Sequence, residues 1–108
     1  MKISELENMG FKLLTSDNGG EVFHGYVGDL LSEVMAHAPS ESVWLTVQSH
    51  VNIVAVAVVA GIKAVVLCEG YEFDSETLKK AEEEKISLFS TKMSSFESAG
   101  KLYSAGLR

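Results

Sequence analysis

The spacing of apolar residues changes several times along the chain, and each spacing predicts a different element. In the first part, Gly10 is placed to end a short helix, Asp29 to cap a longer one and Pro39 to stop it. A run rich in Ser, Asp, Asn and Gly at residues 16–20 predicts a turn. The expected elements are a helix at residues 3–9, strands at residues 11–15 and 21–27, and a helix at residues 30–38.

The second part of the chain alternates between short apolar runs and helical patterns. Asp74 is placed to cap one helix, and Ser94 with Glu97 forms the Ser-x-x-Glu capping box of another, which ends at Gly106. The expected elements are strands at residues 43–47, 63–68 and 86–89, and helices at residues 53–60, 75–85 and 94–106.

Residues 53–60 are the ambiguous segment, because their many valines favour a strand. Asn52 before them and Gly61 after them instead match the ends of a helix. Two flanking strands that run in parallel also need a crossover between them. We therefore predict a buried helix here.

From residue 43 onward the order is strand, helix, strand, helix, strand, helix. Such alternation builds a parallel sheet with right-handed crossovers. We therefore predict one α/β domain over residues 1–108, a three-layer sandwich with a mainly parallel central sheet of about four to five strands and flanking helices.

Composition and charge exclude several classes of function. The chain has 46% hydrophobic and 22% charged residues, as in globular proteins, and its net charge of -6 repels nucleic acid. The longest apolar stretch, residues 53–62, is about half the length of a membrane-spanning helix, and residues 1–5 do not resemble a signal peptide. The single Cys68 lies in an apolar run and reads as buried. We expect a cytoplasmic protein that binds neither nucleic acid nor membrane.

Motifs for catalysis are missing from the chain. There is no Gly-x-Ser-x-Gly elbow for nucleophilic hydrolysis, and no glycine precedes Lys-Ser or Lys-Thr as in a phosphate-binding loop. His24, His37 and His50 lack the spacing of a zinc site. We therefore predict no enzyme activity, no metal and no cofactor. An enzyme would need His50 or His24 as its base.

Two polar clusters follow predicted strands, at the position where open α/β sheets bind ligands. Gln48, His50 and Asn52 form one, and Thr91 and Ser94 belong to the other. As a hypothesis, these five residues form a crevice for a small polar or anionic ligand. The simpler interpretation is structural: Asn52 and Ser94 cap helices, and His50 bonds to a neighbouring loop.

The aromatic side chains predict a surface patch. A chain of 108 residues has difficulty burying all of its rings, and the set concerned is Phe23, Tyr26, Trp44, Phe96 and Tyr103. A homodimer would cover the patch that remains.

Three ordered blocks of sequence resemble the DRTGG domain family. They are residues 25–35 (GYVGDLLSEVM), 48–57 (QSHVNIVAVA) and 90–103 (STKMSSFESAGKLY). With the strand and helix between them, the resemblance covers nearly the whole chain. The segment that would read Asp-Arg-Thr-Gly-Gly is Glu-Val-Phe-His-Gly at residues 21–25, so Val22 stands where the family has its arginine.

The resemblance implies an α/β domain similar to the N-terminal domain of HPr kinase/phosphorylase. Such domains accompany CBS domains in regulatory pyrophosphatases and precede some phosphotransacetylases, where they act as dimerising, regulatory modules. The phosphate-binding loop of HPr kinase belongs to a different domain, which is absent from residues 1–108. The resemblance therefore does not imply kinase activity.

Our leading hypothesis is a non-catalytic regulatory or interaction module that forms a homodimer and pairs with a separate protein partner or a small ligand. The alternative is a sensor of a nucleotide or phosphorylated metabolite, which would use the crevice around Gln48, His50, Asn52, Thr91 and Ser94. The sequence names neither the pathway nor the ligand.

Overall fold

Helices and strands alternate along residues 1–108, all of which the computed structural model describes. In order they are the 3₁₀ helix η1 (Ile3–Met9), β1 (Lys12–Leu13), β2 (His24–Val27), α1 (Leu31–His37), β3 (Ser42–Thr46), α2 (Asn52–Ala60), β4 (Ala64–Leu67), α3 (Ser75–Glu84), β5 (Ser87–Ser90) and α4 (Ser95–Ser104). The strands form one five-stranded sheet in the order β1-β5-β4-β3-β2. Strands β2 to β5 run in parallel, and β1 is antiparallel to β5.

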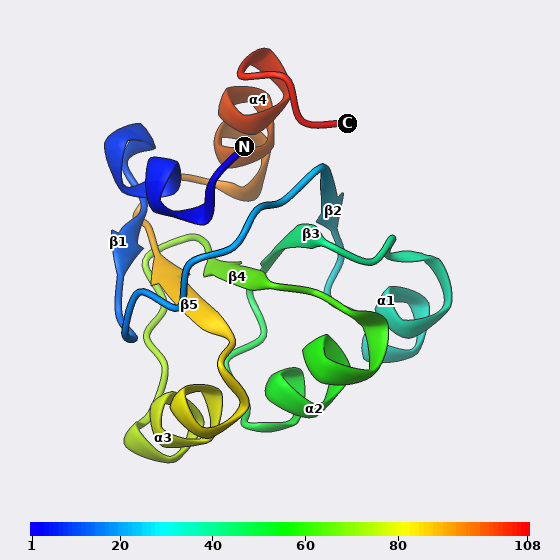
Figure 1. The fold of residues 1–108 in the computed structure, drawn as a ribbon, viewed down its shortest axis with the longest axis vertical. Coiled ribbons are helices and arrows are strands. Elements are labelled where there is room, and N and C mark those ends of the chain that lie inside the picture. Colours follow the sequence, from blue (N-terminus) through cyan, green and yellow to red (C-terminus); the bar gives the residue numbers. More distant parts are fainter.

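The helices form a layer on each face of the sheet (Figure 1). Each of the strands β2, β3 and β4 is followed by a helix and then by its own neighbour in the sheet. Right-handed crossovers that all step in one direction put α1, α2 and α3 on the same face. Helices η1 and α4 cover the other face.

The central strands are buried along their whole length, because both of their faces are covered. Trp44 and Val65 pack toward α1, α2 and α3, whereas Val43, Leu45 and Val66 pack toward η1 and α4. Alternate residues of a strand point to opposite faces, so a continuous apolar run is what a doubly covered strand requires. The predicted α/β class and mainly parallel sheet are confirmed.

The ambiguous segment at residues 53–60 is a helix, as predicted. Helix α2 ends at Gly61, whose φ is 73°, and the next N–H, that of Ile62, donates to Ala57 O at 2.9 Å. This left-handed ending explains the glycine. None of the helices has both the length and the apolar character needed to cross a membrane.

Strand β2 begins at His24, later than predicted, because the residues before it pair with the start of the chain. Ile3 N–H donates to Gly20 O at 3.1 Å, and Val22 N–H donates to Met1 O at 2.8 Å. The ammonium of Met1 donates in turn to Val22 O at 3.0 Å. The predicted strand at residues 21–27 is therefore divided between two partners.

Strand β1 is also shorter than predicted. Leu14 N–H still donates to Leu88 O at 2.8 Å, and Thr15 Oγ1 accepts the N–H of Leu88 at 3.2 Å. Ser16 then turns away, and its N–H and hydroxyl donate to the two carboxylate oxygens of Glu82 on α3 at 2.7 and 2.8 Å. This side-chain anchor ends the pairing with β5.

Two helix ends differ in their fit to the left-handed backbone, and they predict opposite changes in stability. A Cβ at Gly61 would lie 2.9 Å from the Cβ of Ser40. We expect Gly61→Ala to lower the free energy of unfolding by about 2 kcal/mol, because left-handed backbone alone costs ~1–2 kcal/mol for other residues.

Lys85, which ends α3, has the same left-handed backbone at φ 59° and bears this cost, because it is not a glycine. We expect Lys85→Gly to raise the free energy of unfolding by about 1 kcal/mol.

Urea denaturation followed by circular dichroism measures both variants. Equal stability of Gly61→Ala and the wild type would contradict the steric argument.

Candidate functional site

The carboxyl ends of β2 to β5 lie at one edge of the sheet, because these strands are parallel. The chain leaves β4 toward α3 on one face and leaves β5 toward α4 on the opposite face. Two adjacent strands whose connections part in this way form a switch point, where open α/β sheets bind ligands. The candidate site therefore lies at the ends of β4 and β5.

Hydrogen bonds within the protein connect the two segments that leave β4 and β5 at this switch point. Glu69 N–H donates to Met93 O at 2.9 Å, and the Glu69 carboxylate accepts the N–H of Ser95 at 2.9 Å. Ser94 Oγ accepts the N–H of Glu97 at 3.1 Å. A helix N-terminus favours a negative charge, and Glu69 supplies it here.

The first predicted cluster is used in local hydrogen bonds. Gln48 N–H donates to Thr46 Oγ1 at 3.1 Å, and Gln48 Nε2 donates to Asp29 O at 3.0 Å. His50 Nδ1 accepts the N–H of Asn52 at 3.1 Å. These contacts shape the turn between β3 and α2.

Two predicted helix caps are wrong. Asn52 is the first residue of α2, and the side chain that accepts a hydrogen bond there is His50. Asp29 does not cap α1, because its carboxylate accepts from the hydroxyl of Thr46 and the N–H of Val47, both at 2.9 Å. Donors at the end of the neighbouring strand β3 thus compete successfully for Asp29.

The second predicted cluster lies apart from the first. Thr91 is buried at the end of β5, and its hydroxyl oxygen accepts the N–H of Met93 at 3.1 Å. Ser94 caps α4 as predicted. Strand β4 separates the ends of β3 and β5, and α2 and α4 lie on opposite faces. The structure does not bring Thr91 and Ser94 into one cavity with residues 48–52.

Thr91 instead lines a cavity of about 530 Å³ that contains three lysines, which we call the lysine cavity. Lys12 reaches it from β1, Lys92 from the loop after β5, and Lys101 from α4. The sequence pattern pointed to Thr91 and Ser94 but gave no sign that Lys12 and Lys101 lie beside Thr91. Lys12 is placed there by its pairing with Ser90, which lies far away in sequence, and Lys101 by its hydrogen bond to Met9 O.

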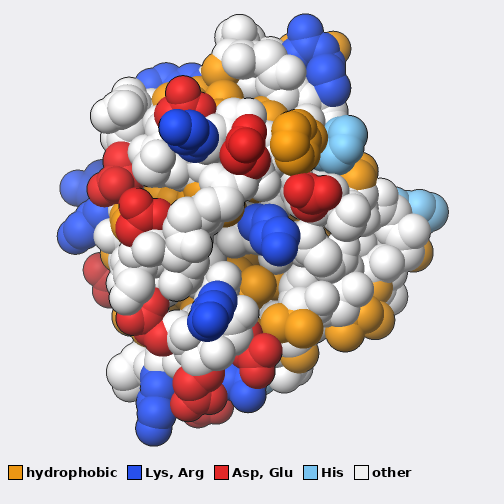
Figure 2. Space-filling model, in the orientation of Figure 1, with side chains coloured by type: hydrophobic (Ala, Val, Ile, Leu, Met, Phe, Trp, Pro, Cys, Tyr) orange, Lys and Arg blue, Asp and Glu red, His pale blue; other side chains and the backbone are white.

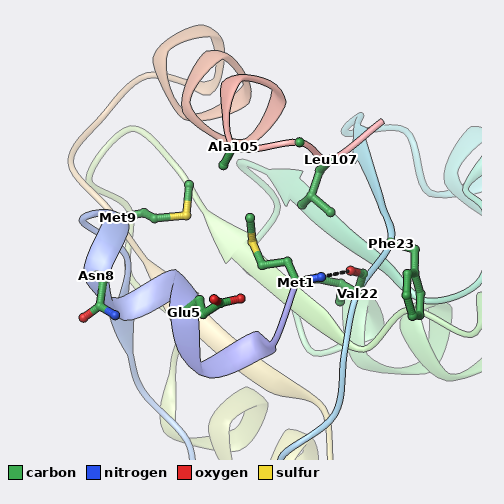
Figure 3. A pocket seen from close by; sticks show the side chains of 9 residues that line it. Met1, Glu5, Asn8, Met9, Val22, Phe23, Ala105 and Leu107 are labelled. Carbon is green, nitrogen blue, oxygen red and sulfur yellow. Dashed lines mark hydrogen bonds between the residues drawn. The ribbon is translucent and has the colours of Figure 1, made fainter.

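A second cavity, of about 510 Å³, lies between η1 and the end of the chain (Figure 3). Met1, Met9 and Leu107 contribute much of its apolar lining. Its polar groups bond within the protein: the ammonium of Met1 donates to Val22 O, and the Glu5 carboxylate accepts the N–H of Lys2 at 2.7 Å. This cavity is a seam between the two ends of the chain.

A smaller apolar hollow of about 140 Å³ lies between β2 and α4, lined by Val27 and Tyr103 among others. Four exposed apolar side chains belong to β2, to the residue before it and to α4, and we call them the β2–α4 surface: Phe23, Val27, Phe96 and Tyr103. The exposed fractions are 90% for Phe96, 61% for Tyr103 and 49% for Val27. Phe96 and Tyr103 are seven residues apart, so they lie on one side of α4. Of the five rings in the predicted patch, Phe23, Phe96 and Tyr103 are exposed, whereas Trp44 is buried and Tyr26 packs against the core on the opposite face of the sheet.

A second exposed apolar surface lies over α1 and α2, at the lower right of Figure 2. Met35, Val58 and Val59 contribute to it, and Val59 is 70% exposed. Helix α2 has no charged residue, and its outward side is as apolar as its buried side. A helix that is hydrophobic all round is usually covered.

Two of the chain's reactive side chains are buried or paired, whereas His24 is exposed. Cys68 is fully buried, and burial raises the pKa of its thiol, so the thiol stays protonated. His37 lies 3.1 Å from Glu33 on the surface of α1. No three His, Cys, Asp or Glu side chains are grouped closely enough to hold a metal ion.

The chain matches no protein-family model and no curated protein. The resemblance to the DRTGG family therefore stays a prediction from the sequence blocks.

One carboxylate near the switch point predicts an acid dependence of stability. Asp74 caps α3, and its carboxylate accepts from the hydroxyl of Thr77 at 2.7 Å and from the N–H of Thr77 at 2.8 Å. These bonds hold the pKa of Asp74 below its usual value, helped by nearby His50. The stabilisation is complete above the unfolded-state pKa of about 3.9 and is lost as the pH falls through the lower folded-state pKa.

We expect Asp74→Asn, which keeps a capping oxygen without the charge, to flatten the dependence of stability on pH below about pH 4. Urea denaturation midpoints measured between neutral pH and about pH 2 for both proteins test this. An equally steep loss of stability in the variant would contradict the assignment to Asp74.

Proposed function

We propose that the chain is a non-catalytic regulatory or interaction module that forms a homodimer through the β2–α4 surface. The observation that carries the proposal is that exposed aromatic and aliphatic side chains lie next to a free edge of the sheet. Strand β2 is the last strand of the sheet, and its outer side pairs with no strand. Val27 and Tyr103 are exposed and line the hollow at this edge.

The backbone of β2 supports pairing with a second copy. Gly28 N–H donates to Leu45 O of β3, so backbone groups of alternate residues face inward. Gly25 and Val27 therefore direct their N–H and C=O groups outward. No lysine, proline or carboxylate occurs in β2 to protect the edge from pairing.

The hollow beside β2 fits the side chain that such pairing would deliver. In an antiparallel pairing with its twofold axis at Tyr26, Val27 of each chain lies opposite Gly25 of the other. A Cβ at Gly25 would meet nothing within 4 Å, so there is open space above this residue. Val27 of the second copy would enter that space and contact the hollow lined by Leu45 and Tyr103. An isologous interface of this kind closes on itself as a dimer.

Size and chemistry also support the proposal. A standard interface buries about 800 Å² per partner, about one seventh of the 5714 Å² that the chain exposes.

The Cys68 thiol is buried and protonated, and His50 Nδ1 already accepts a backbone N–H, so neither atom is free for catalysis. The likeness to dimerising DRTGG domains, similar to the N-terminal domain of HPr kinase, agrees with a regulatory role in the cytoplasm.

The dimer predicts a specific effect of charge at the edge strand. We expect Val27→Lys to weaken dimerisation by at least about tenfold, because two ammonium groups would be buried without partners. Sedimentation equilibrium gives the dissociation constant of each protein. Val59→Lys on the α1–α2 surface is the matched control, since it places the same charge on the other exposed apolar surface.

A wild-type monomer at high micromolar concentration would overturn the proposed dimer. Loss of the dimer in Val59→Lys, but not in Val27→Lys, would move the interface to α1 and α2.

A further inference from the structure

The lysine cavity gathers positive charge in a protein that is negatively charged overall. Lys12, Lys92 and Lys101 come from three different elements and line one space of about 530 Å³. The chain has nine Lys and Arg residues and a net charge of -6, so a third of its cationic side chains meet here. A space of this size is typical of small-molecule sites.

The three ammonium groups have no anionic partner within the protein. No carboxylate oxygen lies within 4.0 Å of any of them. The ion pairs of the chain involve only His37 and Lys80 as the basic partners. Lys101 Nζ donates to Met9 O at 3.3 Å, a neutral acceptor. Glu72 is the single acidic residue in the lining. Three mutually repelling cations therefore favour the entry of an anion.

Residues of the lining carry further donors that no acceptor within the protein occupies. The backbone N–H groups of Tyr71 and Lys92 donate to no acceptor within the protein. The Ser90 hydroxyl makes no hydrogen bond, and the Thr91 hydroxyl accepts one from Met93 N–H but donates none. Tyr71 adds an aromatic ring that is more than half exposed. The lining thus combines ammonium, hydroxyl and backbone donors with one flat apolar surface.

The position of the cavity agrees with the general rule for ligand sites in α/β sheets. It lies at the end of β5, next to the switch point between β4 and β5. Glu69 occupies the start of α4, so an anion cannot use that helix terminus and must be held by side chains. The three lysines provide them.

We infer that the lysine cavity binds a phosphorylated small molecule with at least two negative charges. Lys12, Lys92 and Lys101 hold the phosphate oxygens, and Tyr71 contacts the organic part. The site is at the opposite edge of the sheet from β2, so this inference does not rest on the proposed dimer.

Isothermal titration calorimetry with pyrophosphate and with ATP, at constant ionic strength, tests the inference. We expect both to bind with dissociation constants below about 1 mM. Each single change, Lys12→Gln, Lys92→Gln or Lys101→Gln, weakens binding about tenfold, and the triple change abolishes it. Lys63→Gln is the matched control, because Lys63 is an exposed lysine at the other end of the parallel strands. Tighter binding of ATP than of pyrophosphate assigns the difference to contacts beyond the phosphates, and Tyr71→Leu then removes it.

Amide chemical shifts of the wild type provide a measurement that needs no variant. Pyrophosphate should shift the amide signals of Gly70, Tyr71 and Lys92 and leave those of β2 unchanged. The absence of binding to either compound, or equal weakening by Lys63→Gln, would overturn the inference. Val27→Lys should bind both compounds as the wild type does, so failure of the dimer and failure of this site are distinguishable.

Discussion

The need to cover both faces of the central strands determines most of this structure. Strands β3 and β4 are apolar on both sides, so water must be excluded from both. The crossovers from β2 to β5 all step the same way and leave their helices on one face. Residues at the two ends of the chain, in η1 and α4, therefore supply the second layer. Ile3, Leu6 and Leu102 are buried in it.

This distribution of helices over the two faces leaves different surfaces at the two edges of the sheet. Helix α4 starts near the end of β5 and packs across the sheet against β3 and β2. Its outward side carries Tyr103 beside the free edge of β2, whereas Lys101 turns to the cavity near β5 and β1. One helix thus contributes to both the proposed dimer surface and the proposed anion site. The apolar outer side of α2 remains separate from both.

The parts of the fold that depend on local pattern were predictable from the sequence. The order of elements from residue 43 onward, the helical state of residues 53–60 and the cap at Ser94 follow from spacing and end signals. The cap predicted at Asn52 was wrong because of a local competitor, His50, whereas the other errors occurred where a distant partner competes with a local one. Asp29 bonds to Thr46 and Val47 instead of its own helix, and residues 20–22 pair with the N-terminal segment. Lys12 and Lys101 could not be assigned to one site because the pairing of β1 with β5 and the contact of Lys101 with Met9 bring them together only in the folded chain.

The seam between the two ends of the chain has a consequence for how this unit can be combined with others. Met1 and Leu107 line the same cavity, so both ends emerge on the η1–α4 side of the sheet (Figure 3). Domains whose ends lie close together tolerate insertion into a host polypeptide, because the flanking segments need not be pulled apart. The same proximity permits circular permutation, with a short linker across the seam and new ends in the exposed loop at residues 17–19. The positions of the two ends therefore suit both insertion into a host polypeptide and circular permutation.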